Sequence, residues 1–173
     1  MRVAPLAVAL LALSAAAFAQ VHVVLPDTSQ TTTFQANVSE QADVTVPATV
    51  TFSVTDVSVD TDSAAQTVTA SNIVLVDGNA LRISLQANAA NFTAPAGGAT
   101  TWAASDVSWN AATFSNGTGA SGTLSSAAYT QVATTNANAA STTANDLTFT
   151  LASKLVDRAG QHTLVATWRF ESL

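Results

Sequence analysis

Two histidines, His22 and His162, are the only imidazole bases in the chain, so a Ser–His–Asp catalytic set would have to use one of them. The sequence contains no Gly-x-Ser-x-Gly motif to place a nucleophilic serine on a strand-to-helix turn. His162 follows Gly160 at the start of a predicted strand, where an exposed histidine without a chemical role is the ordinary case. We therefore predict that the protein is not an enzyme and assign no catalytic residue. A secreted hydrolase that depends on His162 is the third alternative.

Asp60 and Asp62 are the best candidates for metal ligands. Asp60-Thr61-Asp62 could offer a calcium ion two carboxylates and backbone carbonyls at one end of a sheet. The segment lacks the glycine and the distal glutamate of an EF-hand loop, so a solvated turn is the competing interpretation. Glycosidase chemistry would need two carboxyls across a cleft, and no run of aromatic residues surrounds these aspartates. We predict no cofactor, with calcium as the one candidate ion.

Aromatic residues could bind a ligand by stacking. Trp109 lies in an alternating segment and Trp168 in the middle of the last predicted strand, so both are expected in the core. Trp102 follows the turn at Gly97 and is expected to be exposed. Trp102 and Phe92 are therefore the candidate ligand-binding residues of a carbohydrate-binding or adhesive module.

The bulk composition excludes several classes of function. Charged residues make up 9% of the 173 residues, far below the roughly 25% of typical soluble domains. Five Lys and Arg residues and a net charge of −6 cannot build the basic patch that a nucleic-acid partner or an anionic membrane requires. The absence of cysteine excludes disulfides, thiolate nucleophiles and Cys-ligated metals.

The N-terminal residues 1–19 have the pattern of a secretory signal peptide. Arg2 supplies the positive charge, residues 3–13 form an apolar stretch, and Ala17-Phe18-Ala19 is a small-x-small cleavage site. No cysteine follows for a lipid anchor, and no second apolar stretch is long enough to span a bilayer. We expect a secreted or cell-surface protein of bacterial type, with the periplasm as another possible destination.

Most of the remaining chain alternates apolar and polar residues with a period of two, which is typical of half-buried strands. The predicted strands are residues 31–38, 42–46, 49–54, 67–70, 73–76, 81–87, 107–109, 127–133, 146–151 and 162–170. Residues 116–122 and 134–145 are predicted to be loops.

Two pairings are predicted between these strands. Asp77-Gly78 lies between two apolar runs and predicts a hairpin that joins residues 73–76 to residues 81–87. A Pro-Gly-Gly turn at residues 95–98 then leads toward residues 107–109, which are expected to complete a central hairpin with residues 81–87.

Short alternating strands separated by turn signals at intervals of roughly 8–14 residues predict an all-β protein. We expect an antiparallel two-sheet β-sandwich, immunoglobulin-like in the broad sense, in a single domain over residues 20–173. A closed β-barrel is the alternative. The alternation predicts which faces are buried, but it does not determine the order of the strands.

Residues 79–109 and 159–173 resemble a loose group of uncharacterised exported bacterial proteins. The resemblance rests on a leucine-rich strand, Asn91-Phe92-Thr93 with Pro95, Ser105-Asp106-Val107-Ser108-Trp109, and a final strand that contains Trp168. More distantly, the plan is similar to surface modules such as WxL-type wall proteins and fimbrial subunits, although the Trp-x-Leu signature is absent. The resemblance implies a β-sandwich outside the cytoplasm and implies no activity.

The leading hypothesis is a structural or surface-assembly protein that associates with itself or with other surface proteins. Residues 20–38 carry an assembly segment with apolar side chains at Val21, Val23, Leu25 and Phe34, separated from the rest by Pro26 and a polar stretch. This segment could add as a strand to the sheet edge of a neighbouring subunit. The competing interpretation is that it forms the molecule's own first strand.

Overall fold

The computed structural model describes residues 21–173, so the predicted signal peptide at residues 1–19 lies outside the described residues. Residues 38–173 form one compact unit, and the described residues before them, 21–37, belong to a separate unit. All strands described below lie in the compact unit.

Eleven strands and one short 3-10 helix make up the regular structure of the described residues. The strands are β1 (Gln41–Thr45), β2 (Thr61–Asp62), β3 (Gln66–Val74), β4 (Leu81–Ala87), β5 (Val107–Trp109), β6 (Gly117–Gly119), β7 (Gly122–Thr123), β8 (Thr130–Thr135), β9 (Thr142–Leu147), β10 (Phe149–Leu151) and β11 (Ala166–Ser172). The 3-10 helix, η1, spans Ala104–Asp106. The prediction of an all-β fold is therefore confirmed.

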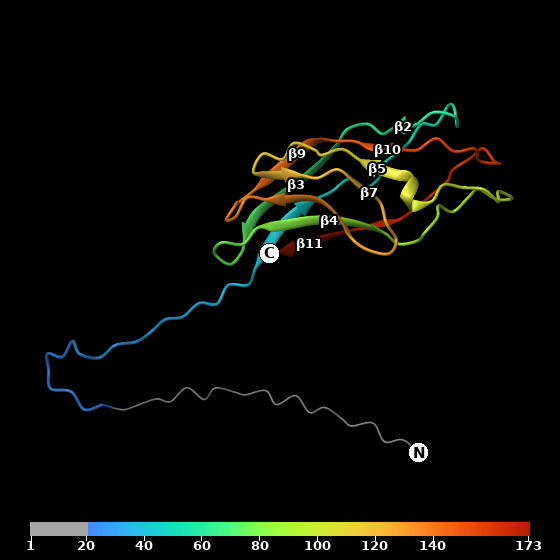
Figure 1. The fold of residues 1–173 in the computed structure, drawn as a ribbon. Helices are drawn as coiled ribbons and strands as arrows, with labels where there is room; N and C mark the ends of the chain where they lie inside the picture. The colour runs from blue at the N-terminus through green and yellow to red at the C-terminus, as the bar shows by residue number, and fades with distance from the viewer. Residues whose placement is uncertain (1–20) are drawn as a thin grey trace, which may run out of the picture. The chain divides into compact units, whose positions relative to one another are not determined.

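The strands form three antiparallel sheets, with orders β1-β3-β9, β2-β10-β5-β7 and β11-β4-β8-β6. The first two sheets are continuous along the chain, because β9 runs into β10 after one residue and the Ser63 N–H donates to the Phe149 carbonyl oxygen at 2.8 Å. Figure 1 shows β2, β3, β9 and β10 on one side of the compact unit and β4 and β11 on the other. The arrangement is sandwich-like. Each sheet keeps two edge strands in residues 38–173, so the alternative of a closed barrel is wrong.

A large apolar cluster fills most of the space between the layers, and a smaller one contains Ala70, Ile73 and Leu81. Val68 of β3 and Leu147 of β9 meet Ile83 of β4 and Val132 of β8 in the large cluster, and all four side chains are fully buried. Burial of apolar area is the main favourable term in folding, and this core has no disulfide to supplement it. The alternation predicted for β4, β5 and β10 is confirmed by their buried positions, although Ser84 of β4 is buried as well.

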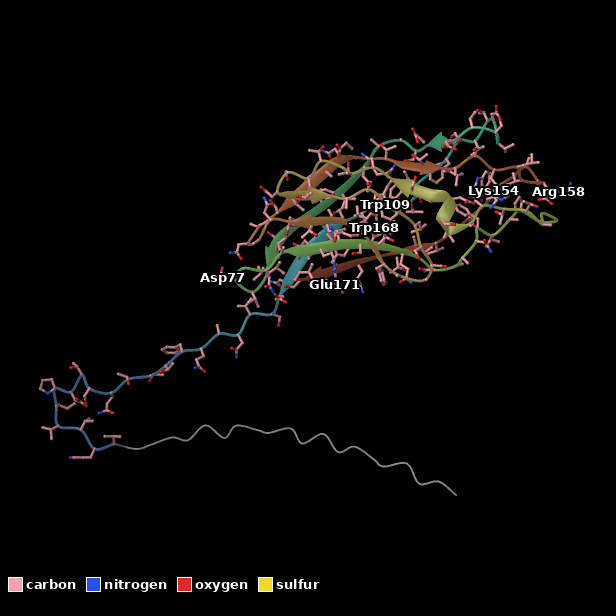
Figure 2. The ribbon with its side chains drawn as sticks, viewed as in Figure 1. Asp77, Trp109, Lys154, Arg158, Trp168 and Glu171 are labelled. Atoms are coloured by element: carbon pink, nitrogen blue, oxygen red, sulfur yellow. The ribbon has the colours of Figure 1, made fainter. Side chains whose placement is uncertain are left out.

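The predicted hairpin across Asp77-Gly78 is wrong, although the turn itself is present. Gly78 has a φ of +86°, which favours glycine, and the Asn79 N–H donates to the Val76 carbonyl oxygen at 3.0 Å. The two strands that the turn connects pair in different sheets, β3 with β1 and β9, and β4 with β11 and β8. The turn therefore carries the chain from one layer to the other; Asp77 marks this end of the domain in Figure 2.

The predicted central hairpin of residues 81–87 and 107–109 is also wrong, because β4 and β5 belong to different sheets. The turn between them is real: the Gly98 N–H donates to the Pro95 carbonyl oxygen at 2.9 Å. Both strands place apolar side chains into the same core from opposite sides. Alternation identified the buried faces correctly and gave no information about partners.

Several other boundaries differ from the predictions. Residues 31–38 and 49–54 form no strand. The predicted loop at 116–122 contains β6 and the first residue of β7, and the predicted loop at 134–145 contains most of β9. Small residues explain the second error, because Thr142 and Ala144 are buried in β9 without the large apolar side chains that usually indicate a strand.

Gly122 is required by close packing against Trp109. A Cβ atom at Gly122 would lie 2.6 Å from the Trp109 ring, which also packs edge-on against Phe149 and donates its indole N–H to the Ala120 carbonyl oxygen. The ring is therefore held on several sides and cannot move away freely.

We predict that Gly122→Ala destabilises the protein by about 1–3 kcal/mol, because an added methyl group in a packed site displaces its neighbours. Thr123→Ala, at the exposed next position, should change stability by less than about 0.5 kcal/mol. Urea unfolding followed by tryptophan fluorescence measures both. Equal stabilities for the two variants would contradict the packing role of Gly122.

Candidate binding cavity

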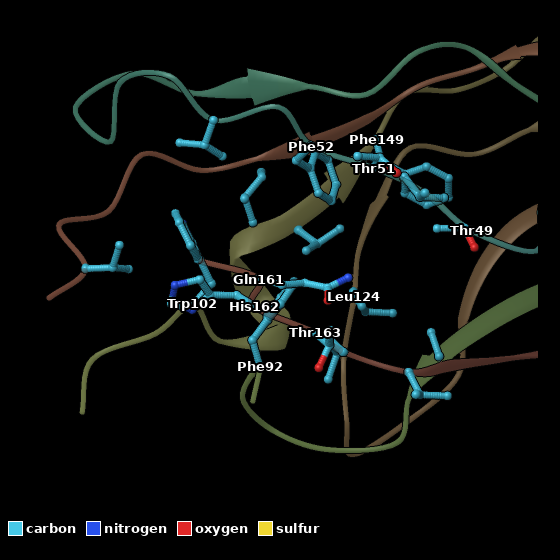
Figure 3. Close-up of a pocket in the computed structure, with 18 of the residues that line it drawn as sticks. Thr49, Thr51, Phe52, Phe92, Trp102, Leu124, Phe149, Gln161, His162 and Thr163 are labelled. Carbon is cyan, nitrogen blue, oxygen red and sulfur yellow. The ribbon is translucent and has the colours of Figure 1, made fainter. Parts of the chain in front are cut away.

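A cavity of about 640 Å³ lies in the compact unit, within the range of roughly 300–1,000 Å³ that is usual for ligand pockets. Its aromatic lining comes from parts of the chain that are far apart in sequence: Phe52, Phe92, Trp102, Phe149 and Trp168. Figure 3 shows Phe52, Phe92, Trp102 and Phe149 around the pocket. No Asp or Glu lies among the lining residues, and Arg158 is their one Lys or Arg. The cavity therefore suits apolar groups.

One wall of the cavity is the segment 46–57, which we call the cover segment. Its exposure alternates, with Val50, Phe52 and Val54 partly buried against the core and the residues between them exposed. It belongs to no strand and makes no backbone–backbone hydrogen bond with any described residue. The predicted strand at 49–54 therefore has the burial pattern of a strand without a partner.

The first residues of the last strand, β11, line the cavity. This strand is a sheet edge, because β4 is its single partner among the described residues. Ala80 and Leu173 exchange two backbone hydrogen bonds just beyond the β4–β11 ladder. In an antiparallel ladder, hydrogen-bonded residue pairs alternate with pairs that are not hydrogen-bonded. Since Leu173 belongs to a hydrogen-bonded pair, the other odd-numbered residues of β11 also hydrogen-bond to β4. The backbone groups of Ala166, Trp168, Phe170 and Ser172 therefore point away from β4, along an unpaired edge.

Trp102 lies inside the molecule, contrary to the expectation that it is exposed. Its side chain is 4% exposed, and its indole N–H donates to the Ala152 carbonyl oxygen at 2.9 Å. The structure does bring Trp102 and Phe92 together, edge to face with ring centroids 6.4 Å apart, and both line the cavity. Trp168 was expected in the core, and it is partly buried with its ring on the cavity.

His162 packs against Trp102 with ring centroids 5.0 Å apart, and each of its ring nitrogens has a partner. Nδ1 lies 2.8 Å from the Thr101 hydroxyl and Nε2 lies 3.1 Å from the Arg158 carbonyl oxygen. Neither partner is a carboxylate that could orient the imidazole for general-base catalysis. The contacts describe a histidine that joins two loops at the cavity.

Asp157 fastens the loop at residues 97–100, beside the cavity. Its carboxylate accepts hydrogen bonds from the N–H groups of Ala99 and Thr100, each at 2.9 Å. These two bonds stabilise the charged form and hold the pKa of Asp157 below its ordinary value. The neighbouring Arg158, at the opposite end of the domain from Asp77, donates to the Gly97 carbonyl oxygen at 3.3 Å.

Asp60 and Asp62 each accept a hydrogen bond from a different residue. Asp60 accepts from the Ser153 N–H at 2.7 Å, and Asp62 accepts from the Thr150 hydroxyl at 2.6 Å across the β2–β10 pair. Among residues 21–173, no group of three or more His, Cys, Asp or Glu side chains could hold a metal ion. The calcium site stays a prediction, and the structure gives these carboxylates a role in joining strands.

The assembly segment has no strand of its own. Residues 21–40 form none, so the interpretation in which they pair as the molecule's first strand is wrong for this structure. Val21, Leu25 and Phe34 are exposed, Phe34 by 92%, whereas Val23 is intermediate. The only side-chain hydrogen bonds within residues 21–37 join Asp27, Ser29 and Gln30 in a local turn.

The sequence predicted neither the cavity nor its cover segment. The alternation at residues 49–54 located the buried face of Phe52, but alternation cannot show whether a backbone has a partner. No signal in the sequence indicated that β11 would be an edge strand.

No protein-family model, curated protein or solved structure matches this chain. Within residues 21–173, no helix is long and apolar enough to cross a membrane.

We predict that the protection of the Ala99 and Thr100 amides against hydrogen exchange depends on pH through Asp157. A folded-state pKa below the unfolded value of about 3.9 means that the stabilisation is present above that value and is lost as the pH falls through the folded-state pKa. Asp157→Asn should lower the protection factors at neutral pH as well. Asp77→Asn, at the other end of the domain, is the control. Protection that stays constant with pH in the wild type would contradict the role of Asp157.

Proposed function

We propose that the protein is an exported, non-enzymatic structural subunit that assembles with copies of itself at or beyond the bacterial cell surface. The observation that carries the proposal is the coexistence of a segment without strand pairing that exposes apolar side chains, residues 21–37, and a sandwich with an unpaired edge at β11. Each is unfavourable in an isolated molecule, and each could be satisfied by another copy.

The edge of β11 supports this proposal because it is long and regular. Edge strands of stable monomers are commonly short, bulged, covered, or marked by proline or by charged side chains. β11 is seven residues long, pairs with β4 in unbroken register and contains no proline, and the Glu171 carboxylate of its one acidic residue is paired with Arg82 and Arg169. An edge of this kind is a template for pairing with another chain.

The apolar side chains of the assembly segment give a second reason. Val21, Val24, Leu25 and Phe34 are each more than half exposed, and large apolar side chains gathered on one short segment indicate a surface that is covered in the working state. The signal-peptide pattern at residues 1–19 and the low charge of the chain support an extracytoplasmic place for this assembly.

The carbohydrate-binding alternative depends on Trp102 and Phe92 as an exposed stacking platform. Trp102 is buried and Phe92 packs against it, so no observation on the described residues favours a flat sugar-binding surface. A glycan array comparing the wild type with Trp102→Ala tests this alternative directly.

We predict that deletion of residues 20–30 abolishes assembly and leaves the fold intact, because the deleted residues belong to a unit separate from the core. Light scattering and negative-stain microscopy should show oligomers or filaments for the exported wild-type protein and monomers for the deletion. The melting temperatures should agree within about 2 °C, since no core contact is removed. A wild type that stays monomeric at high concentration would overturn the proposal.

A further inference from the structure

We infer that the cavity beside β11 is a slot for one β-strand and that its occupant is the segment 21–25 of a second copy. The inference rests on the proposed self-assembly and deepens it by naming the receiving site and the inserted residues. It is carried by three features of the described residues: unpaired backbone, apolar volume and the length of the tether.

Unpaired backbone is present on both walls of the slot. In the cavity lining, β11 offers outward-pointing backbone groups at Ala166 and Trp168, and its edge continues past the cavity to Ser172. The cover segment offers a backbone that makes no backbone–backbone hydrogen bond with the described residues. Figure 3 shows Thr49 and Thr51 across the pocket from Gln161 and Thr163. A strand inserted about 4.8 Å from β11 would form a ladder of hydrogen bonds with it. It would displace no existing strand, because this edge of β11 has no partner among the described residues.

The apolar volume fits the side chains of the inserted segment. Val21, Val23 and Leu25 alternate with His22 and Val24, so a strand over these five residues turns three aliphatic side chains to one face. The cavity lining is mostly aromatic and aliphatic, and its polar members, among them Thr49, Gln161 and His162, include no carboxylate. Filling it would remove apolar side-chain surface of both copies from water, which is favourable in proportion to the area buried.

The tether is long enough to reach a neighbour. Residues 26–37 number twelve and span up to about 40 Å when extended, which exceeds the radius of gyration of roughly 14 Å for a domain of this size. Pro26 ends the inserted strand, because proline cannot donate a backbone hydrogen bond. Residues 31–38 fit the role of the inserted strand less well, since they lie too close to β1, which begins at Gln41, to reach another copy. In this arrangement Phe34 is part of the tether.

Hydrogen exchange on the exported protein, residues 20–173, tests whether the edge of β11 receives the inserted strand. The amides of Trp168 and Phe170, which point away from β4, should exchange at least about tenfold more slowly in the assembled fraction than in the monomer. The amides of Thr167 and Arg169, which bond to β4, should be unchanged and serve as internal controls. Protection of Trp168 and Phe170 in a monomer that does not assemble would show that the segment occupies its own slot, and would overturn the inference.

A filled cavity provides the second test. Val54→Phe, in the cover segment, should raise the melting temperature and raise the concentration needed for assembly at least about tenfold, because the guest side chains lose their space. Val59→Phe makes the same change at a position that is 54% exposed and outside the cavity, and should alter neither. Lost assembly with raised stability cannot result from misfolding.

The inserted face provides the third test. Val21, Val23 and Leu25 replaced together by serine should prevent assembly, whereas His22 and Val24 replaced by serine should reduce it far less. If the wild type assembles and all these variants assemble equally, the slot is wrong while the proposed function stands. If the wild type never assembles, the proposed function fails and the slot fails with it.

Discussion

The burial of β4 between two neighbouring strands and against the opposite layer is the interaction on which the rest of the structure depends. Ile83 and Leu85 project from β4 into the larger apolar cluster, where they meet Val68 and Leu147 from the other layer. With no cysteine in the chain, no disulfide supplements this hydrophobic burial in holding the layers together. Because β4 takes β8 on one side and β11 on the other, β11 becomes the sheet edge.

That edge explains why one side of the sandwich is closed by side chains and not by backbone pairing. The cover segment places Val50, Phe52 and Val54 against the core but leaves its own peptide groups without protein partners. The result is a largely apolar cavity open to solvent, next to a backbone without protein partners, two departures from regular packing and pairing. Proteins tend to retain such local conflicts where another molecule resolves them.

The sequence predicts the fold class and most buried faces, because alternation is a local property. It locates Leu147, Phe149 and Leu151 on one buried face, and it identifies the turn at Gly78. It fails where pairing is decided at long range: the Gly78 turn joins two sheets, and Thr142 is buried in a strand of small residues. The cavity could not be predicted at all, since it arises from the missing partner of the cover segment.

The chain enters and leaves the compact unit at the same pole. The Ser172 hydroxyl donates to the Glu40 carboxylate at 2.7 Å, so the start of the unit lies beside its C-terminal strand. Tension applied through the two ends would therefore open β1 and β11 at this pole, one hydrogen bond after another, and would not stretch the domain along its strands. A force transmitted lengthwise along β11 would instead load all hydrogen bonds of the β4–β11 ladder in shear at once. The direction of pull, and not only the number of contacts, would decide the mechanical strength of this domain.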